Sequence, residues 1–129
     1  MVRDVNKSDA ARYVKQAEEF LASAQDCAEK RRHNAAGFNA TQAVINANDA
    51  LTIYFLGKRA SADHREAIRL HVDVVRIISD GSCRDIVKDA LEMRSEFGYL
   101  GMEAKEKDAR KWILSAIKFV SWVKSKISV

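Results

Sequence analysis

Arginine, tyrosine and histidine side chains occur at two places in the sequence with spacings that suit chemistry on a phosphate. Arg94 precedes Tyr99 by five positions, and Arg59 precedes His64 by the same offset. A guanidinium holds phosphate oxygens through charge-assisted hydrogen bonds, and an imidazole exchanges protons near neutral pH. Lys58 adds a cation beside Arg59. These five residues are the predicted ligand-binding site.

The same residues have plainer interpretations. Arg94 follows Leu91 and Ala90 on the apolar side of a predicted helix, so its stem can pack while its charged end reaches water. His64 at the start of a helix can be an ordinary surface side chain. With 22 lysines and arginines in the chain, such spacings also arise by chance.

Several other chemistries lack their residues. The sequence has no glycine-rich phosphate loop, no Glu-x-x-His pair and no nucleophile-elbow serine. Its three histidines do not pair at four-residue spacing, and Cys27 and Cys83 form no CxxC motif, so they are predicted to be reduced packing residues. We therefore predict no metal and no cofactor.

The composition predicts one helical domain spanning residues 1–129. Hydrophobic residues make up 47% and charged residues 31% of the 129 positions, with no proline and five glycines, so little interrupts a helix. A net charge of +4 suits weak contact with phosphates but equally suits solubility. Because no apolar run approaches the roughly 20 residues of a membrane span and the start lacks an apolar signal segment, we expect a cytoplasmic protein without membrane contact.

Apolar residues recur at three- and four-residue steps over five segments, which predicts five helices. Their expected ranges are 8–32, 35–56, 63–79, 82–98 and 102–127, with Gly57 and Gly81 as stops and a turn at 98–101. Short connections make successive helices antiparallel, so the fold class is an all-α, up-and-down bundle of four or five helices. In such a bundle the end of the second helix, the start of the third, the end of the fourth and the start of the fifth meet at one pole.

Two features favour a homodimer. The second helix is apolar around much of its circumference, which is typical of a helix that is central or also covered by a second subunit. Trp122 lies off the apolar stripe of the last helix and is a candidate for a subunit contact. Asn39, Asn46 and Asn48 interrupt the apolar second helix, and each needs a partner for its amide.

The whole pattern resembles the HEPN superfamily (higher eukaryotes and prokaryotes nucleotide-binding domain). The residues that carry the resemblance are the alanine-rich run Ala43–Gly57, the following loop with His64, then Arg94, the tyrosine turn, and a last helix with spaced Ala109, Ala116, Phe119 and Val120. The resemblance covers roughly residues 8–127. It implies a helical bundle, commonly dimeric, that works beside a minimal nucleotidyltransferase or acts as a metal-independent ribonuclease of toxin–antitoxin or defence systems.

The ribonuclease branch of that family carries Arg-x(4–6)-His ahead of its last helix. Here the matching residues run from Arg94 to Tyr99, so a tyrosine replaces the histidine. An ordinary tyrosine, with a pKa near ~10, exchanges protons poorly at neutral pH. The resemblance therefore implies a non-catalytic nucleotide- or RNA-binding module that partners a nucleotidyltransferase. The alternatives are a ribonuclease using Arg94 with Tyr99 or His64, and a purely structural homodimer.

Overall fold

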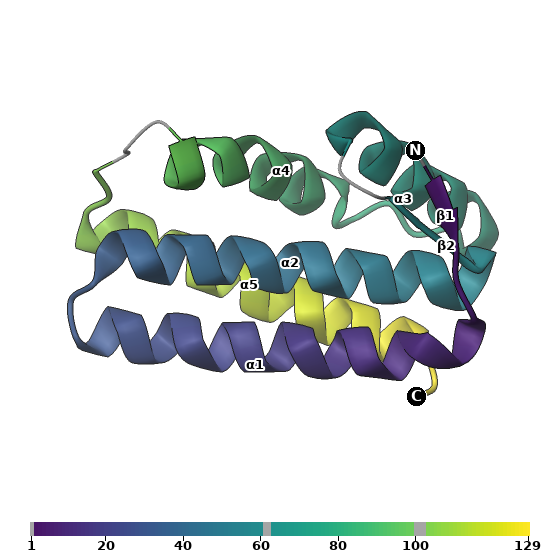
Figure 1. Cartoon of the computed structure of the whole chain (residues 1–129), viewed down its shortest axis with the longest axis horizontal. Helices are drawn as coiled ribbons and strands as arrows, with labels where there is room; N and C mark the ends of the chain where they lie inside the picture. Colours follow the sequence, from purple (N-terminus) through teal and green to yellow (C-terminus); the bar gives the residue numbers. More distant parts are fainter. Residues whose placement is uncertain (1, 61–62, 100–102) are drawn as a thin grey trace.

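The computed structural model describes residues 2–60, 63–99 and 103–129, with side chains for all of these except 95–99. Its elements are β1 (Val2–Asp4), the 3-10 turn η1 (Lys7–Asp9), α1 (Ala10–Glu29), α2 (His33–Leu56), β2 (Lys58–Ala60), α3 (His64–Ile78), α4 (Arg84–Tyr99) and α5 (Glu106–Lys126). In the described residues, the helices dominate and one small ribbon accompanies them (Figure 1). The predicted all-α bundle is confirmed.

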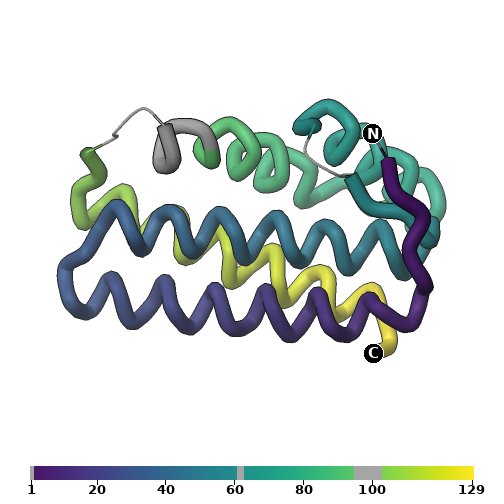
Figure 2. The backbone as a smooth tube through the Cα atoms, in the orientation of Figure 1, coloured from purple at the N-terminus to yellow at the C-terminus, as the bar shows by residue number. Residues whose placement is uncertain are grey.

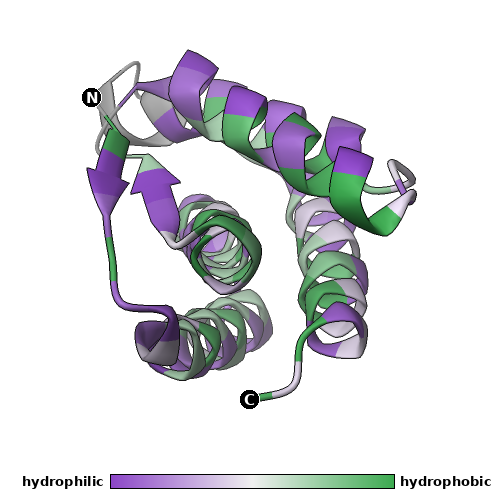
Figure 3. Ribbon diagram, turned by 90° about the vertical axis from the view of Figure 1, so that its right-hand side faces the viewer, coloured by the Kyte–Doolittle hydropathy of each residue, from purple (hydrophilic) through white to green (hydrophobic). Residues whose placement is uncertain are grey.

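Helix α2 is the centre of the molecule. It packs against each of the other four helices, and it lies in the middle when the bundle is viewed along its length (Figure 3). Ala36, Ala43 and Ala50 along it have no exposed surface, and such small side chains let neighbouring helices approach closely. Packing inside one chain therefore accounts for the apolar circumference of α2, without a second subunit.

Four of the helices alternate in direction, and α3 stands outside the alternation. Helices α1 and α4 run one way, and α2 and α5 run the other (Figures 1 and 2). Helix α3 has 15 residues and lies across the bundle, lengthwise in the view of Figure 3 where α1 and α2 are seen end-on. Because α3 lies across the bundle, it does not take part in the alternation of directions. The end of α4 therefore lies at the same end of the bundle as the start of α2.

The expectation that four helix ends meet at one pole is therefore wrong. The start of α5 lies by the start of α2, where the backbone N–H of Ala104 donates a 2.6 Å hydrogen bond to Oδ1 of Asn34. Of the three helix ends that were predicted to lie beside the end of α2, only the start of α3 does so. Any site that includes Arg94 must therefore lie along α2 and not at its end.

A two-stranded ribbon that the sequence did not reveal shapes the region after α2. Strands β1 and β2 are antiparallel, with Arg3 opposite Arg59 and Asp4 opposite Lys58. Gly57 turns the chain from α2 into β2 with φ +66°, and its carbonyl accepts a 2.8 Å hydrogen bond from the N–H of Val5. Three-residue strands are too short for a two-residue alternation to be recognised.

The observed ends of the helices lie within four residues of the predicted ends. Helix α2 ends before Gly57 as predicted, and Asp63 caps α3 by accepting a 2.8 Å hydrogen bond from the N–H of Arg65. Helix α3 ends at Ile78, one residue short of its predicted end, and Ser79 caps it in a left-handed conformation (φ 54°) before Gly81. Helix α4 continues through Gly98 to Tyr99, where a turn was predicted, and residues 100–101 of that turn lie outside the described residues.

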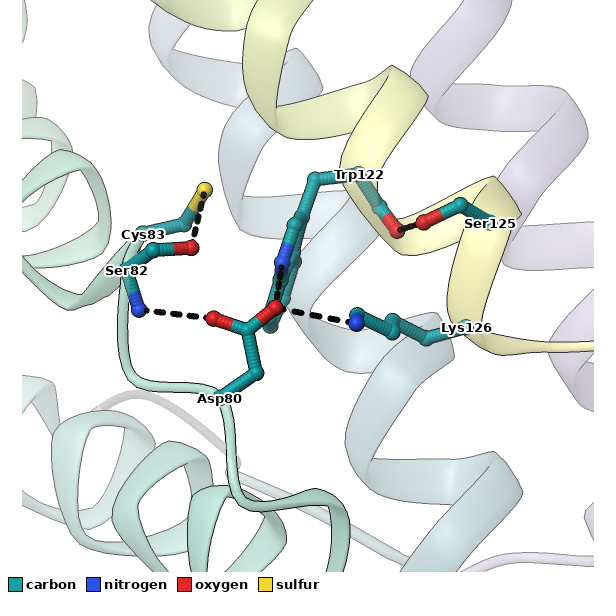
Figure 4. A network of polar contacts seen from close by, with 6 residues as sticks. All are labelled: Asp80, Ser82, Cys83, Trp122, Ser125 and Lys126. Carbon is teal, nitrogen blue, oxygen red and sulfur yellow. Dashed lines mark hydrogen bonds and ion pairs between the residues drawn. The ribbon is translucent and has the colours of Figure 1, made fainter.

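Trp122 takes part in an internal network that ties the connection between α3 and α4 to the end of α5 (Figure 4). Its indole N–H donates to Oδ2 of Asp80 at 2.9 Å, and Nζ of Lys126 lies 2.9 Å from the same oxygen. Hydrogen bonds from Trp122, then Lys126 and Ser82, hold the pKa of Asp80 well below its ordinary value. The Trp122 ring also packs 5.7 Å from Phe119. Its position off the stripe thus reflects an internal partner.

Each asparagine in the apolar helix finds the partner that its amide requires. Asn39 and Asn46 donate to the carbonyls of Ala35 and Gln42, at 2.9 and 2.8 Å. Oδ1 of Asn48 lies 2.9 Å from Nδ1 of the fully buried His71. The prediction of satisfied amides is confirmed.

Candidate functional site

A cavity of about 190 Å³ opens beside the middle of α2, where α1, β2, α3 and α4 all contribute to its wall. Its polar and charged lining comes from Tyr13, Gln42, Asn46, Asp49, Arg59, Asp63, His64 and Arg94. These residues are spread over more than 80 positions of the sequence. The cavity therefore exists only in the folded bundle.

Three of the five predicted site residues lie together in this cavity. Arg59, His64 and Arg94 all line it, although they come from β2, α3 and α4. Lys58 does not join them. It lines a separate cavity with Leu70 and Asp73, because successive residues of a strand point to opposite faces. The side chain of Tyr99 lies outside the described residues.

Local structure explains where the three residues stand. The ribbon fixes the backbone of Arg59, and its guanidinium carbon lies 5.7 Å from the centre of the Tyr13 ring, within cation–π range. The cap at Asp63 fixes the first turn of α3, which begins at His64. Arg94 follows the buried Leu91 by three positions on α4, so the packing of α4 on α2 sets its place.

Asp49 is the site residue that sequence reasoning missed. It lies in α2 and lines the same cavity as Arg59 and Arg94. Burial raises its pKa from 3.8 to about 7, even though the two guanidinium groups favour the charged form. Among the described residues, no hydrogen bond or ion pair holds its carboxylate. Asp49 is thus a carboxylic acid that exchanges its proton near neutral pH.

One signal in the sequence could have identified Asp49. Gln42, Asn46 and Asp49 recur at four- and three-residue steps, so they form a polar stripe along one face of an otherwise apolar helix. A charge on such a helix needs a charged partner or a cavity. The amide oxygen Oε1 of Gln42 is buried in the protein without a hydrogen-bond partner, so the stripe still offers an acceptor to a ligand.

The charges of the cavity are close to balance. Arg59 and Arg94 bring two positive charges, and Asp49 and Asp63 bring two negative charges when ionised. Backbone hydrogen bonding, first from Arg65, lowers the pKa of Asp63, so this carboxylate stays ionised at neutral pH. The proton of Asp49 therefore decides whether the cavity is neutral or positive. Chemically, the arrangement can bind an anion and can exchange a proton.

Other cavities of the described chain have different linings, and the one of about 560 Å³ between α1 and α5 is lined by Glu29, His33, Glu106 and Arg110 among others. Among the described residues, histidine, cysteine and acidic side chains form no group of three that could hold a metal ion. No helix in these ranges is both long and apolar enough to cross a membrane. A cavity of about 230 Å³ lies between α2, α4 and α5 beside Trp112, and its charged residues, Asp89, Glu92 and Lys111, are all exposed.

The comparison with protein families agrees with the helical fold. Residues 10–126 match the model of the HEPN domain family, a range that contains all five helices and the whole lining of the cavity. No curated protein matches the sequence. The matched range covers most of the chain, and the chain therefore belongs to the HEPN domain family.

Proposed function

We propose that this HEPN domain binds the phosphate of a nucleotide or of RNA in the cavity beside α2, as a non-catalytic partner of a minimal nucleotidyltransferase. The observation that carries the proposal is that Arg59 and Arg94, 35 positions apart in sequence, line one cavity together with His64. Two guanidinium groups in one concavity suit the planar, bidentate recognition of phosphate oxygens.

The remaining lining supports a ligand larger than inorganic phosphate. The stripe from Gln42 to Asp49 spans about 10 Å along α2, at roughly 1.5 Å per residue. Its amides and the unpartnered oxygen of Gln42 suit the hydrogen-bonding edge of a base or a ribose. The phosphate would lie at the arginine end of this stripe.

The transfer chemistry would come from the partner. Strands β1 and β2 have three residues each, so the described chain offers no larger sheet on which a nucleotidyltransferase could mount catalytic carboxylates. The resemblance to HEPN domains that accompany small nucleotidyltransferases supports such a division of labour. A small nucleotidyltransferase encoded in the adjacent reading frame would support this part of the proposal, and its reconstituted complex with this chain can be sought by co-purification.

Binding is tested by titrating ATP, AMP, adenosine and a short single-stranded RNA at pH 6.5 and measuring both heat and thermal stability. Ligands with a phosphate should raise the Tm and adenosine should not, because a ligand that binds only the native state stabilises it. Arg59→Ala and Arg94→Ala should each weaken binding about 10-fold or more, since a charged hydrogen bond contributes about 1.5–3 kcal/mol.

Lys58→Ala is the matched control, because it removes a neighbouring cation that faces a different cavity. It should leave the affinity within about twofold, apart from a small long-range electrostatic effect. Equal losses in all three variants would mean that general positive charge, and not the cavity, attracts the ligand. Flat titrations with every phosphate ligand would overturn the proposal.

A second candidate function is metal-independent cleavage of RNA, the alternative of the toxin or defence type. It is favoured by one observation: His64 and Arg94 share the cavity with Asp49, and the pKa of Asp49 is raised to about 7. His64 and Asp49 could act as general base and general acid. Labelled RNA with EDTA tests this candidate. Cleavage that is lost in Arg94→Ala and His64→Ala but kept in Lys58→Ala would establish it, whereas intact RNA at high protein concentration would exclude it.

A homodimer remains part of the proposal, on a different surface from the one predicted. On α5, Leu114 is 59% exposed and Ile117 is 38% exposed. Both line the groove that α5 forms with α1, where Gln25 borders the cavities on either side. Large apolar side chains along one groove support self-association at the α1–α5 face.

A further inference from the structure

The charges of the two arginines and two aspartates in the cavity affect how strongly an anion binds there. We infer that the phosphate-bearing ligand binds together with a proton on Asp49, so that the neutral carboxylic acid donates a hydrogen bond to a phosphate oxygen. The inference rests on the proposed function and deepens it. It assigns to Asp49 a role in selecting the ligand and in setting the pH range over which the ligand binds.

The geometry supplies the first reason. Asp49 lines the same cavity as Arg59 and Arg94, and both guanidinium groups are near enough to act on its charge. An anion held by both guanidinium groups must therefore come close to Asp49. An ionised carboxylate beside a phosphate would repel it, whereas the protonated acid offers a donor at the same place.

The charges supply the second reason. With Asp49 and Asp63 ionised, the two arginines are balanced and an anion gains no net attraction. A proton on Asp49 leaves a net charge of +1. This proton is available, because burial already raises the pKa of Asp49 to about 7. A bound anion raises that pKa further, since a nearby negative charge disfavours ionisation, so binding takes up a proton at neutral and higher pH.

The other titratable groups in the lining of the cavity are Arg59, Arg94, Asp63, His64 and Tyr13. Arg59 and Arg94 stay charged at all accessible pH values. Asp63 stays ionised through its backbone hydrogen bonds, first from Arg65, and the ring of Tyr13 lies within cation–π range of Arg59. His64 is the group that could imitate Asp49, because a protonated imidazole would also attract an anion. The experiment must separate these two residues.

The probe is sulfate, whose charge does not change between pH 6 and 8.5, at constant ionic strength, with binding followed by NMR chemical shifts. Wild-type affinity should be highest near pH 6 and should fall above pH 7, by at most about tenfold per pH unit for a one-proton linkage. Asp49→Asn should bind with little pH dependence, because its amide is a neutral donor of similar shape. His64→Gln should keep the wild-type dependence.

Asp73→Asn is the control for loss of a negative charge, since Asp73 lines the separate cavity that holds Lys58. Its affinity for sulfate should depend on pH in the same way as that of the wild type. If Asp49→Asn keeps the full pH dependence, or if the dependence disappears in His64→Gln, the inference is wrong although the phosphate site stands. If neither wild type nor Asp49→Asn binds sulfate at pH 6, and ATP and RNA also fail to bind, the proposed function itself is wrong.

Discussion

The indole N–H of Trp122 donates a 2.9 Å hydrogen bond to the carboxylate of Asp80, 42 positions earlier in the chain. The contact joins the end of α5 to the connection between α3 and α4 (Figure 4). It thereby anchors the connection between these two helices to α5. The two helices that carry His64 and Arg94 depend on this connection for their relative placement.

Trp122→Phe should lower the Tm by a few degrees, because it removes the hydrogen bond to Asp80 but keeps most of the buried ring. Thermal unfolding followed by circular dichroism measures this effect. Lys124→Ala is the control, since Lys124 pairs with Glu18 at a site where both side chains are about half exposed. A Trp122→Phe variant as stable as the wild type would show that the contact contributes nothing.

The contact also predicts a pH dependence at the acidic end. Asp80 has a lowered pKa, so its contribution to stability is complete above the ordinary aspartate value of 3.8 and is lost as the pH falls below it. The advantage of the wild type over Asp80→Asn should therefore shrink below about pH 4. Urea denaturation at pH 7 and pH 3 would measure the change.

Asp49 and His71 should give pH effects of opposite sign between pH 7 and 5.5. Burial raises the pKa of Asp49 to about 7, so the folded chain binds its proton more tightly and acidification stabilises. Burial lowers the pKa of His71 from 6.5 to about 4, so the folded chain resists protonation and acidification destabilises. Each effect is on the order of 1 kcal/mol over this range, and they should nearly cancel in the wild type.

In Asp49→Asn only the effect of His71 remains. The free energy of unfolding of this variant should be about 1 kcal/mol lower at pH 5.5 than at pH 7. In His71→Gln only the effect of Asp49 remains, so its free energy of unfolding should be higher at pH 5.5 than at pH 7. This variant is less stable overall, because His71 is fully buried against Asn48. Urea denaturation at the two pH values provides the measurement, with His33→Gln as the control. The same slope in wild type and Asp49→Asn would contradict the raised pKa of Asp49.

Gly57→Ala should destabilise the protein by about 1–2 kcal/mol, the cost of a left-handed conformation for a residue with a Cβ atom. The backbone angle φ is +66° at Gly57, while a Cβ there would meet the carbonyl oxygen of Val5 at an ordinary 3.6 Å. Conformation and not crowding is therefore the cause. Gly57→Asn should cost less, because asparagine tolerates this region. Equal losses for both variants would point to crowding instead.

Leu114→Glu should weaken self-association while leaving the fold intact, because the side chain is 59% exposed at the α1–α5 groove. Ile77→Glu is the matched control, since Ile77 is a similarly exposed apolar residue (55%) on α3. Light scattering between micromolar and hundreds of micromolar protein measures the oligomeric state. A monomeric wild type would remove the homodimer, and dissociation by Ile77→Glu alone would move the contact to α3.

The sequence alone was sufficient for the helices and for part of the site. Apolar periodicity and local signals such as Gly57 and Asp63 act within a few residues, so they can be recognised without knowing the neighbours. Arg59 and His64, predicted together from their five-residue offset, do share one cavity, since only three residues separate the end of β2 from the start of α3. HEPN membership followed from the same whole-chain pattern.

Tertiary structure alone decided the rest. Periodicity says which face of a helix is buried but not against what, so the crosswise position of α3 and the internal partners of Trp122 could not be deduced. The ribbon turned Lys58 away from Arg59, although the two are adjacent in sequence. The pKa of Asp49 depends on burial and on charges 10 and 45 positions away, because desolvation and Coulomb forces act through space and not along the chain.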